Sequence, residues 1–209
     1  MARLITGLDA ARVRENAARI REEIGGAELL AAVKYVPVEE LEVLAEAGVT
    51  LLGENRAQDL AAKAQGHPGT FRWHFIGQLQ SRKVKDLLPY VELIHSFASD
   101  SALRQLERHG TPDTEVLVEV NVSGEEGKAG IAPSELGVFI ERCPVTVAGL
   151  MTMPPFATDP EESRPYFAAL RELAREHDLR HLSMGTSQDY RVAVQEGATI
   201  VRIGTSLYE

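Results

Sequence analysis

A lysine that could act as a nucleophile follows a run of apolar residues near the start of the chain. The run covers Leu29–Val33, Lys34 ends it, and Pro37 follows shortly. A short, continuous apolar run closed by a breaker is typical of a strand buried on both faces. Lys34 then has two interpretations: it marks the point where the strand meets water, or its apolar surroundings favour a neutral amine, which can form a Schiff base with an aldehyde.

Two loops of glycine and hydroxyl residues stand in the last part of the chain, Gly185–Ser187 and Gly204–Ser206. Glycine lets the backbone approach an anion, and N–H groups and hydroxyls can donate to phosphate oxygens. For Ser187 the alternative is a cap of a helix that begins at Asp189, and the charge of Asp189 would compete with phosphate for that helix end. The pair of loops predicts a phosphate site.

A strand arginine completes a set that suits pyridoxal 5′-phosphate. Arg202 alternates with Val201 and Ile203, so it points to the opposite face of its strand. There it could pair with a core acid, extend outward, or donate to a pyridine nitrogen. An arginine keeps its charge, so that nitrogen would stay unprotonated, which disfavours transamination. The aldehyde would meet Lys34, and the phosphate would meet Ser187, Gly204 and Thr205.

Strand and helix patterns that must position these side chains alternate along the chain. Eight short strand patterns stand at 29–33, 51–52, 72–76, 93–95, 115–122, 145–150, 181–183 and 199–203, and the fifth is the longest. Helix patterns separate them. This alternation predicts parallel strands with crossover helices, and eight units predict an α/β fold, a (β/α)8 TIM barrel. An open doubly wound sheet is the alternative.

One further helix, Asp9–Ile24, precedes the first strand, and no helix pattern follows the eighth. We therefore expect Asp9–Ile24 to cover that part of the barrel wall. In such barrels the site lies at the carboxyl ends of the strands, where Lys34 and both glycine loops would meet. We expect residues 1–209 to form a single domain.

Composition excludes several classes of function. The chain has 209 residues, 44% of them apolar, and a formal charge of −9. Without a basic cluster, nucleic acid and anionic membranes are not expected partners. The N-terminus lacks the apolar stretch of a signal peptide, and no run approaches a membrane span. The single Cys143 fits a reducing cytoplasm, and we expect it to act as a small apolar residue.

Taken together, these motifs resemble the family of pyridoxal phosphate homeostasis proteins, also called the YggS/PROSC family. The resemblance runs in order from Leu29 to Ser206. It rests on VKYVP, GENRAQDL, WHFIGQLQSRKVK, IHS, VNVSGEEGKAGI, GLMTMPP and LSMGTSQDYRVAVQEGATIVRIGTS. The resemblance implies a fold similar to the N-terminal barrel of bacterial alanine racemase.

The family's known properties imply a role for each matching residue. Lys34 would carry pyridoxal 5′-phosphate, Asn55 would lie beside it, and Arg202 would face the pyridine nitrogen. Ser187, Gly204 and Thr205 would hold the phosphate. The resemblance also implies a protein that buffers and delivers the cofactor, with apo pyridoxal phosphate enzymes as its recipients and little turnover of its own. The rim after the sixth strand, Met151–Pro155, departs from the family by being longer and proline-rich.

Two enzymatic alternatives stay open. Racemisation of an amino acid needs an acid/base group on each face of the cofactor. In alanine racemase one of these is a tyrosine from the β-domain of a partner subunit, and because the chain ends at Glu209 we expect no such domain here and a monomer. Tyr35, Tyr190 and Tyr208 stand nearest the barrel mouth, but none matches that tyrosine. The second alternative is an isomerase of sugar phosphates that uses no cofactor.

The remaining polar residues have structural interpretations. We expect His74 to be a hydrogen-bonded core histidine, because only one of Trp73 and His74 can face the interior of the barrel. His95 and Asn121 would line the mouth or satisfy backbone groups, and Glu54 would pair with a basic neighbour. Scattered histidines and one cysteine indicate no metal site. Lys128 is a solvated loop charge or a second amine for the aldehyde.

Overall fold

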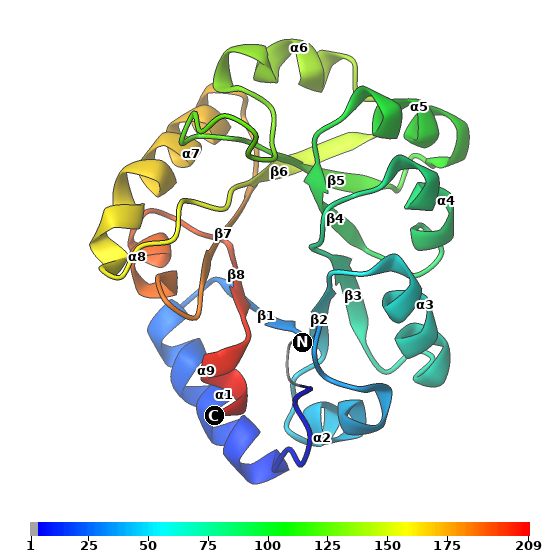
Figure 1. Ribbon diagram of the computed structural model, residues 1–209, viewed down its shortest axis with the longest axis vertical. Helices are drawn as coiled ribbons and strands as arrows, with labels where there is room; N and C mark the ends of the chain where they lie inside the picture. The colour runs from blue at the N-terminus through cyan, green and yellow to red at the C-terminus, as the bar shows by residue number, and fades with distance from the viewer. Residues whose placement is uncertain (1–3) are drawn as a thin grey trace.

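A computed structural model describes residues 4–209, so residues 1–3 of the predicted domain and N-terminus lie outside the described residues. The eight strands form a closed barrel in chain order, and each strand is parallel to its neighbours. The helices form an outer ring around it (Figure 1). The predicted (β/α)8 TIM barrel is confirmed, and the open sheet is wrong because β1 pairs with β8.

The strands are short, as the sequence patterns predict. They are β1 (Glu28–Ala32), β2 (Leu51–Glu54), β3 (Arg72–Phe75), β4 (Leu93–Phe97), β5 (Glu115–Glu119), β6 (Thr146–Met151), β7 (His181–Thr186) and β8 (Ile200–Ile203). The expectation that 115–122 is the longest strand is wrong. After Glu119 the chain leaves β4 and bonds instead to its own returning loop, where Ile131 N donates to Glu119 O at 2.8 Å and Asn121 N to Ile131 O at 3.0 Å.

Helices and short 3-10 turns connect the strands. The helices are α1 (Ala10–Ile24), α2 (Leu41–Glu46), α3 (Ala57–Gly66), α4 (Val84–Leu87), α5 (Asp100–His109), α6 (Leu136–Glu141), α7 (Arg164–Glu176), α8 (Tyr190–Gln195) and α9 (Thr205–Tyr208). The 3-10 turns are η1 (Val38–Glu40), η2 (Ser81–Lys83), η3 (Pro133–Glu135) and η4 (Pro160–Ser163).

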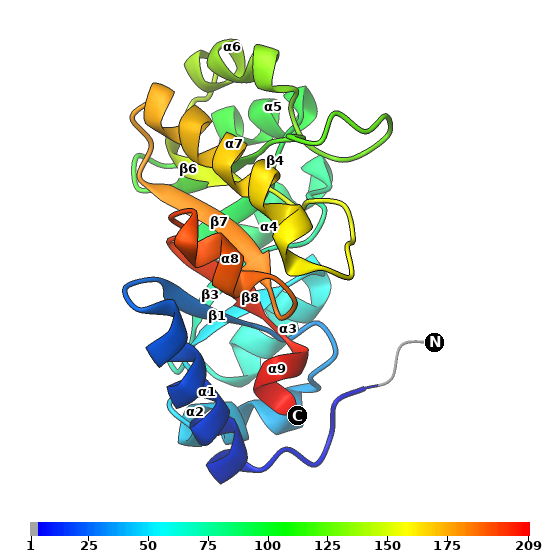
Figure 2. The ribbon, with the colours of Figure 1, turned by 90° about the vertical axis from the view of Figure 1, so that its left-hand side faces the viewer.

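Helix α1 fills the part of the wall beside β1. Its N-cap is Asp9, whose carboxylate accepts from Arg12 N at 2.8 Å, and its buried face is Val13, Ala17, Ile20 and Ile24. It contacts β1, α2, α8 and α9. The expectation that Asp9–Ile24 covers this part of the barrel wall is confirmed. A short helix does follow the eighth strand, contrary to the sequence pattern: α9 packs on α1 through the buried Leu207 (Figure 2).

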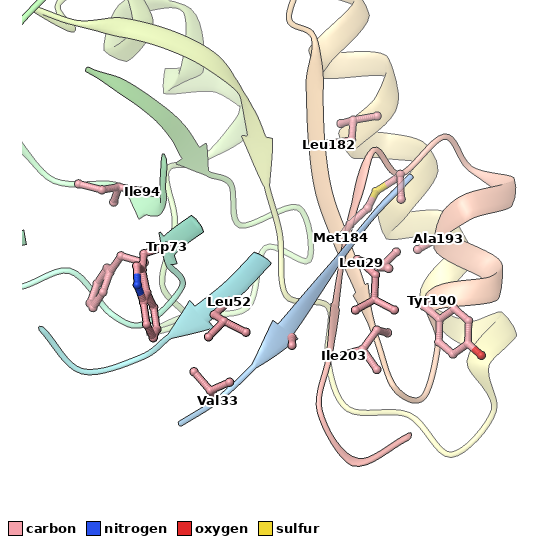
Figure 3. Packing of buried hydrophobic residues seen from close by; sticks show 14 of the residues in the cluster. Leu29, Val33, Leu52, Trp73, Ile94, Leu182, Met184, Tyr190, Ala193 and Ile203 are labelled. Carbon is pink, nitrogen blue, oxygen red and sulfur yellow. The ribbon is translucent and has the colours of Figure 1, made fainter. Parts of the chain in front are cut away.

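The core has two layers on opposite faces of the strands. The larger layer lies between strands and helices, and Figure 3 shows Leu29, Val33, Leu52, Met184 and Ile203 within it. A smaller group fills the inside of the barrel, namely Leu30, Leu51, Leu93, Leu117, Ala148, Met151 and Ile200. Burial on both faces explains why the strands read as nearly continuous apolar runs. Within residues 4–209, no helix is both long enough and apolar enough to span a membrane.

Candidate functional site

One cavity of about 570 Å³ opens at the carboxyl ends of the strands. The loops after β5 and β6 project on this side of the barrel, at the right of Figure 2. All six residues predicted to hold a cofactor line this cavity: Lys34, Asn55, Ser187, Arg202, Gly204 and Thr205. The barrel thus brings together side chains from its first, second, seventh and eighth units.

Lys34 reaches the cavity from a turn rather than from the strand itself. Strand β1 ends at Ala32, Val33 N still donates to Gly53 O at 2.9 Å, and Val36 N then closes a turn onto Val33 O at 3.0 Å. The Lys34 side chain is exposed, and its Nζ lies 4.8 Å from the centre of the Tyr35 ring. The interpretation that Lys34 is buried by its apolar surroundings is therefore wrong, because the turn carries it out of the apolar run into an open mouth.

A buried ion pair lies directly beneath Lys34 and Asn55. Lys63 Nζ lies 2.5 Å from Glu54 Oε2 and donates to Val33 O at 2.7 Å. The other oxygen, Glu54 Oε1, accepts from Asn55 N at 2.6 Å. The prediction that Glu54 pairs with a basic residue is confirmed. The pair links Val33, which precedes Lys34, to Glu54, which precedes Asn55.

Asn55 lines the cavity and carries a buried acceptor that no group of residues 4–209 uses. Its Oδ1 is buried and has no hydrogen-bond partner. Gly77, at the end of the next strand, lies so close that an added Cβ would stand 2.6 Å from Asn55 Cα. Buried polar atoms are nearly always hydrogen-bonded, so this oxygen is placed to accept a donor from a ligand.

The two glycine loops are tied together by Ser187. Its Oγ accepts from Gly204 N at 3.2 Å and from Ser206 N at 3.3 Å. The interpretation of Ser187 as a helix cap is wrong, because the N-cap of α8 is Asp189. The Asp189 carboxylate is held by Thr186 N at 2.8 Å and by Ser163 Oγ at 2.9 Å. Ser187 is therefore part of the cavity wall beside Gly204.

Arg202 forms the floor of the cavity. Its Nη1 donates to Ser183 O at 2.8 Å and to Ser183 Oγ at 2.5 Å, and its Nη2 donates to Thr152 O at 3.0 Å. It is 6% exposed, so it does not extend outward. Its guanidinium contacts are to Ser183, Thr152 and Met153, and no core acid pairs with it among residues 4–209. Burial lowers the pKa of Arg202 to about 10, although Asp189 and Glu119 oppose this shift. The guanidinium is still charged at neutral pH.

A buried hydrogen-bond chain leads from Arg202 down through the barrel. His95 Nδ1 lies 2.8 Å from Ser183 Oγ, and His95 Nε2 lies 2.9 Å from His74 Nδ1. Desolvation lowers the pKa of His95 well below its ordinary value and that of His74 to about 3, so both are neutral. The expectation of a hydrogen-bonded core histidine at 74 is confirmed. His95 does not line the mouth, because β4 continues to Phe97 and leaves His95 inside the barrel.

The donors of Arg202 favour one direction of this chain. Arginine has only donors, so the Ser183 oxygen accepts from it and the Ser183 proton is free for His95 Nδ1. The proton of neutral His95 is then on Nε2 and is donated to His74. The proton of His74 is on its Nε2, which lies 3.9 Å from Glu92 Oε2 at the opposite end of the barrel.

Glu119 is a member of the cavity that our sequence analysis missed. It lines the mouth, and burial raises the pKa of its carboxyl group despite the charge of Arg202. The alternation in Glu115–Glu119 contained the signal, because Leu117 lies inside the barrel and Glu119 shares its face. The strand ends at Glu119 and not at residue 122, so Glu119 stands at the mouth.

The loop after β5 is held by its own side chains. Asn121 Oδ1 accepts from Gly124 N at 3.1 Å, so Asn121 satisfies backbone groups. Lys128 Nζ lies 2.7 Å from Glu125 Oε2, and Lys128 is not part of the cavity wall.

Cys143 is half-buried against the core, and burial raises the pKa of its thiol. Within residues 4–209, no three His, Cys, Asp or Glu side chains gather in a way that could hold a metal ion.

Fold and site together define a barrel of the type found in alanine racemase, and the family model of the alanine racemase N-terminal domain matches residues 8–209. A pyridoxal phosphate homeostasis protein of Aquifex aeolicus is 44% identical over 196 residues, which cover 87% of this chain and 86% of that protein. Another, of Pseudomonas aeruginosa, is 35% identical over 209 residues, with coverage of 95% and 91%. The chain therefore belongs to the family of pyridoxal phosphate homeostasis proteins.

Solved structures show the same likeness. PipY of Synechococcus elongatus, solved with pyridoxal phosphate bound, superposes with a TM-score of 0.81 at 29% identity, and the match covers 94% of this chain and 100% of PipY. Alanine racemase of Corynebacterium glutamicum shares the fold, with a TM-score of 0.74 at 17% identity over 100% of this chain and 63% of the racemase.

Proposed function

We propose that this chain binds pyridoxal 5′-phosphate through Lys34 and that it stores and delivers the cofactor with little turnover of its own. The names of its relatives and the pyridoxal phosphate bound to PipY support this proposal. The observation that carries it is one cavity walled by an accessible amine, a charged guanidinium and a loop of glycine and hydroxyl residues, namely Lys34, Arg202, Ser187, Gly204 and Thr205.

The residues of the cavity fit the cofactor. The unpartnered Asn55 Oδ1 could accept from the ring hydroxyl, which would satisfy a buried acceptor. The wall is open in front of Gly204, where an added Cβ would meet only Ala32 Cβ, at 3.9 Å. A phosphate could therefore approach the backbone there. The volume of about 570 Å³ is in the range of small-ligand sites.

When bound, the cofactor supplies an aldehyde that condenses with a primary amine and releases water. Lys34 is the amine that the cavity offers, because Lys63 is engaged with Glu54 and Lys128 with Glu125. Arg202 stays charged at neutral pH and has only donors, so it would face an unprotonated ring nitrogen. That arrangement makes the ring a weak electron sink and favours holding the cofactor over using it.

The alternative, a racemase, would need a second acid/base group at the cavity. Tyr208 donates its hydroxyl to Ala32 O at 3.1 Å, and burial raises the pKa of that hydroxyl. The Tyr190 hydroxyl is bonded to Glu23 on the outside of the barrel. Neither is among the cavity-lining side chains of the described residues. This arrangement favours the carrier function.

The wider setting of this function is part of the proposal. We propose a single domain over 1–209, since one continuous apolar layer joins the strands to the helices of the described chain. We propose a monomer, and we place it in the cytoplasm because the single Cys143 fits a reducing compartment. Its recipients would be apo forms of enzymes that use pyridoxal phosphate.

Cofactor delivery to an apo enzyme tests the proposal. The loaded chain is mixed with an apo enzyme that depends on pyridoxal phosphate, and recovery of that enzyme's activity is followed. We expect recovery with the wild type, none with Lys34→Ala, and no steady racemisation of L-alanine by the chain alone. Steady racemisation that Lys34→Ala abolishes would favour the racemase instead.

A further inference from the structure

A second cavity, of about 320 Å³, adjoins the mouth cavity. The two share Asn55 and Gln78 as wall residues, so a ligand in one cavity would lie next to the other. Three cationic side chains line the second cavity: Arg56, Arg82 and Lys83. Its other walls are amide and apolar side chains, and no carboxylate is among them. This composition stands out in a chain whose formal charge is −9.

The cations of this cavity are weakly engaged. Arg82 donates to the amide oxygen Gln80 Oε1 at 3.2 Å and forms none of the ion pairs found among the described residues. Arg56 lies 3.5 Å from Asp59 Oδ2, and Lys83 lies 3.4 Å from Asp86 Oδ2. Exposed pairs of this kind contribute little free energy. All three cations are therefore available to an incoming anion.

The backbone adds to the positive potential. Helix α3, ten residues long, begins at Ala57 in the cavity wall, and its N-cap residue Arg56 makes no side-chain capping bond. N–H groups at a helix start favour an anion, although the Asp59 carboxylate in the first turn of α3 opposes this effect. Phe75 supplies an apolar surface in the same wall. A compact anion attached to a flat ring matches both parts of the cavity.

We infer that this second cavity binds the phosphate group of a phosphate monoester, and that it is a waiting position for phosphorylated vitamin B6 compounds next to the Lys34 site. The role as a waiting position rests on the function proposed above, whereas the anion site itself does not. Arg82 and Lys83 bind the phosphate, Arg56 closes the open side, and the shared wall at Asn55 and Gln78 leads to the mouth.

The test uses protein whose first site is permanently filled. The loaded chain is reduced with borohydride, and mass spectrometry shows whether Lys34 carries a pyridoxyl phosphate group. Pyridoxine 5′-phosphate, inorganic phosphate and unphosphorylated pyridoxine are then titrated calorimetrically into this protein. Pyridoxine 5′-phosphate lacks the aldehyde, so its binding reports the phosphate and ring alone.

We expect one equivalent of pyridoxine 5′-phosphate to bind to the filled protein, inorganic phosphate to bind more weakly, and pyridoxine not to bind. Arg82→Gln with Lys83→Gln should weaken binding at least about tenfold, which corresponds to losing one charge-assisted hydrogen bond. Lys85→Gln is the matched control, because Lys85 is an exposed neighbour outside the cavity wall. It should leave binding unchanged.

Two results would overturn the inference: no binding to the filled protein, or binding that Arg82→Gln with Lys83→Gln leaves intact. If reduction leaves Lys34 unmodified, the proposed function fails instead. The phosphate titration of the untreated chain and of the Arg82→Gln, Lys83→Gln variant then still decides whether the anion site exists.

Discussion

Lys63 Nζ lies 2.5 Å from Glu54 Oε2 within the wall of the barrel, and the two side chains are 7% and 0% exposed. The same amine donates to Val33 O, and the same carboxylate accepts from Asn55 N. One buried pair thus fixes the backbone on which Lys34 and Asn55 stand. Such a pair costs desolvation energy, so its value here is the position it gives to two residues of the cavity.

Breaking this pair should destabilise the protein strongly. Lys63→Met removes one partner and leaves the Glu54 carboxylate buried without its cation. We expect the free energy of unfolding, measured with urea, to fall by about 3–5 kcal/mol. Glu54→Gln combined with Lys63→Met should recover part of that loss, because no buried charge is left.

An exposed pair provides the control. Arg142 and Asp100 lie 2.9 Å apart with side chains 52% and 59% exposed. Arg142→Gln should change the free energy of unfolding by less than about 1 kcal/mol. Equal effects of Lys63→Met and Arg142→Gln would show that the buried pair has no special role.

Acid should destabilise the protein through the buried histidines. The folded pKa values of His74 and His95 lie below the ordinary 6.5, that of His74 at about 3, so the unfolded chain binds more protons in this range. Their contribution to stability is complete above about pH 6.5 and is lost as the pH falls toward the folded values. Each histidine adds up to about 1.4 kcal/mol per pH unit to the slope of the free energy of unfolding against pH. Urea unfolding at several pH values between pH 7 and pH 4 measures this slope.

The double variant His74→Gln, His95→Gln should have a shallower acid slope than the wild type. Nitrogen-15 NMR of the wild type at pH 7 should find both imidazoles neutral, each with its proton on Nε2, which is the tautomer in which Ser183 donates to His95. A protonated His95 at pH 7, or an unchanged slope in the double variant, would contradict this account.

Gly77 should be required for the cavity as well as for the fold. In Gly77→Ala the new methyl group would meet the Asn55 backbone, so the carboxyl end of β2 has to move. We expect a stability loss of about 1–3 kcal/mol and cofactor affinity at least about tenfold weaker. Binding is followed by the absorbance of the bound cofactor.

Gly149, in β6, offers a matched control outside the cavity wall. A Cβ there would lie 2.6 Å from the His181 carbonyl carbon, at the start of β7. Gly149→Ala should cost a similar amount of stability and leave cofactor affinity unchanged. An equal loss of affinity in both variants would mean that Gly77 acts only through global stability.

Much of the fold could be predicted from the sequence, because each strand is an apolar run and each helix carries its own apolar face. Asp9 and Ser99 cap α1 and α5 as their residue types suggest. Helix α9 was not predictable, because a four-residue helix has no periodicity and depends on packing against α1.

Six members of the cavity were predictable, but Glu119 and the chemistry of the site were not. Topology alone brings Lys34, Asn55 and Arg202 to one mouth. The exposure of Lys34 depends on a turn closed by Val36, which local apolar patterning cannot reveal. The buried contacts of Arg202 with Ser183 and Thr152 join segments that are distant in sequence, so no local sequence motif predicts them.

The most direct test of the central claim is reduction of the loaded protein with borohydride followed by peptide mass spectrometry. We expect a pyridoxyl phosphate group on Lys34 in the wild type and an unmodified protein in Lys34→Arg, which keeps a positive charge but offers no primary amine. A group found on Lys128 instead, or no modified lysine at all in protein incubated with pyridoxal 5′-phosphate, would contradict it.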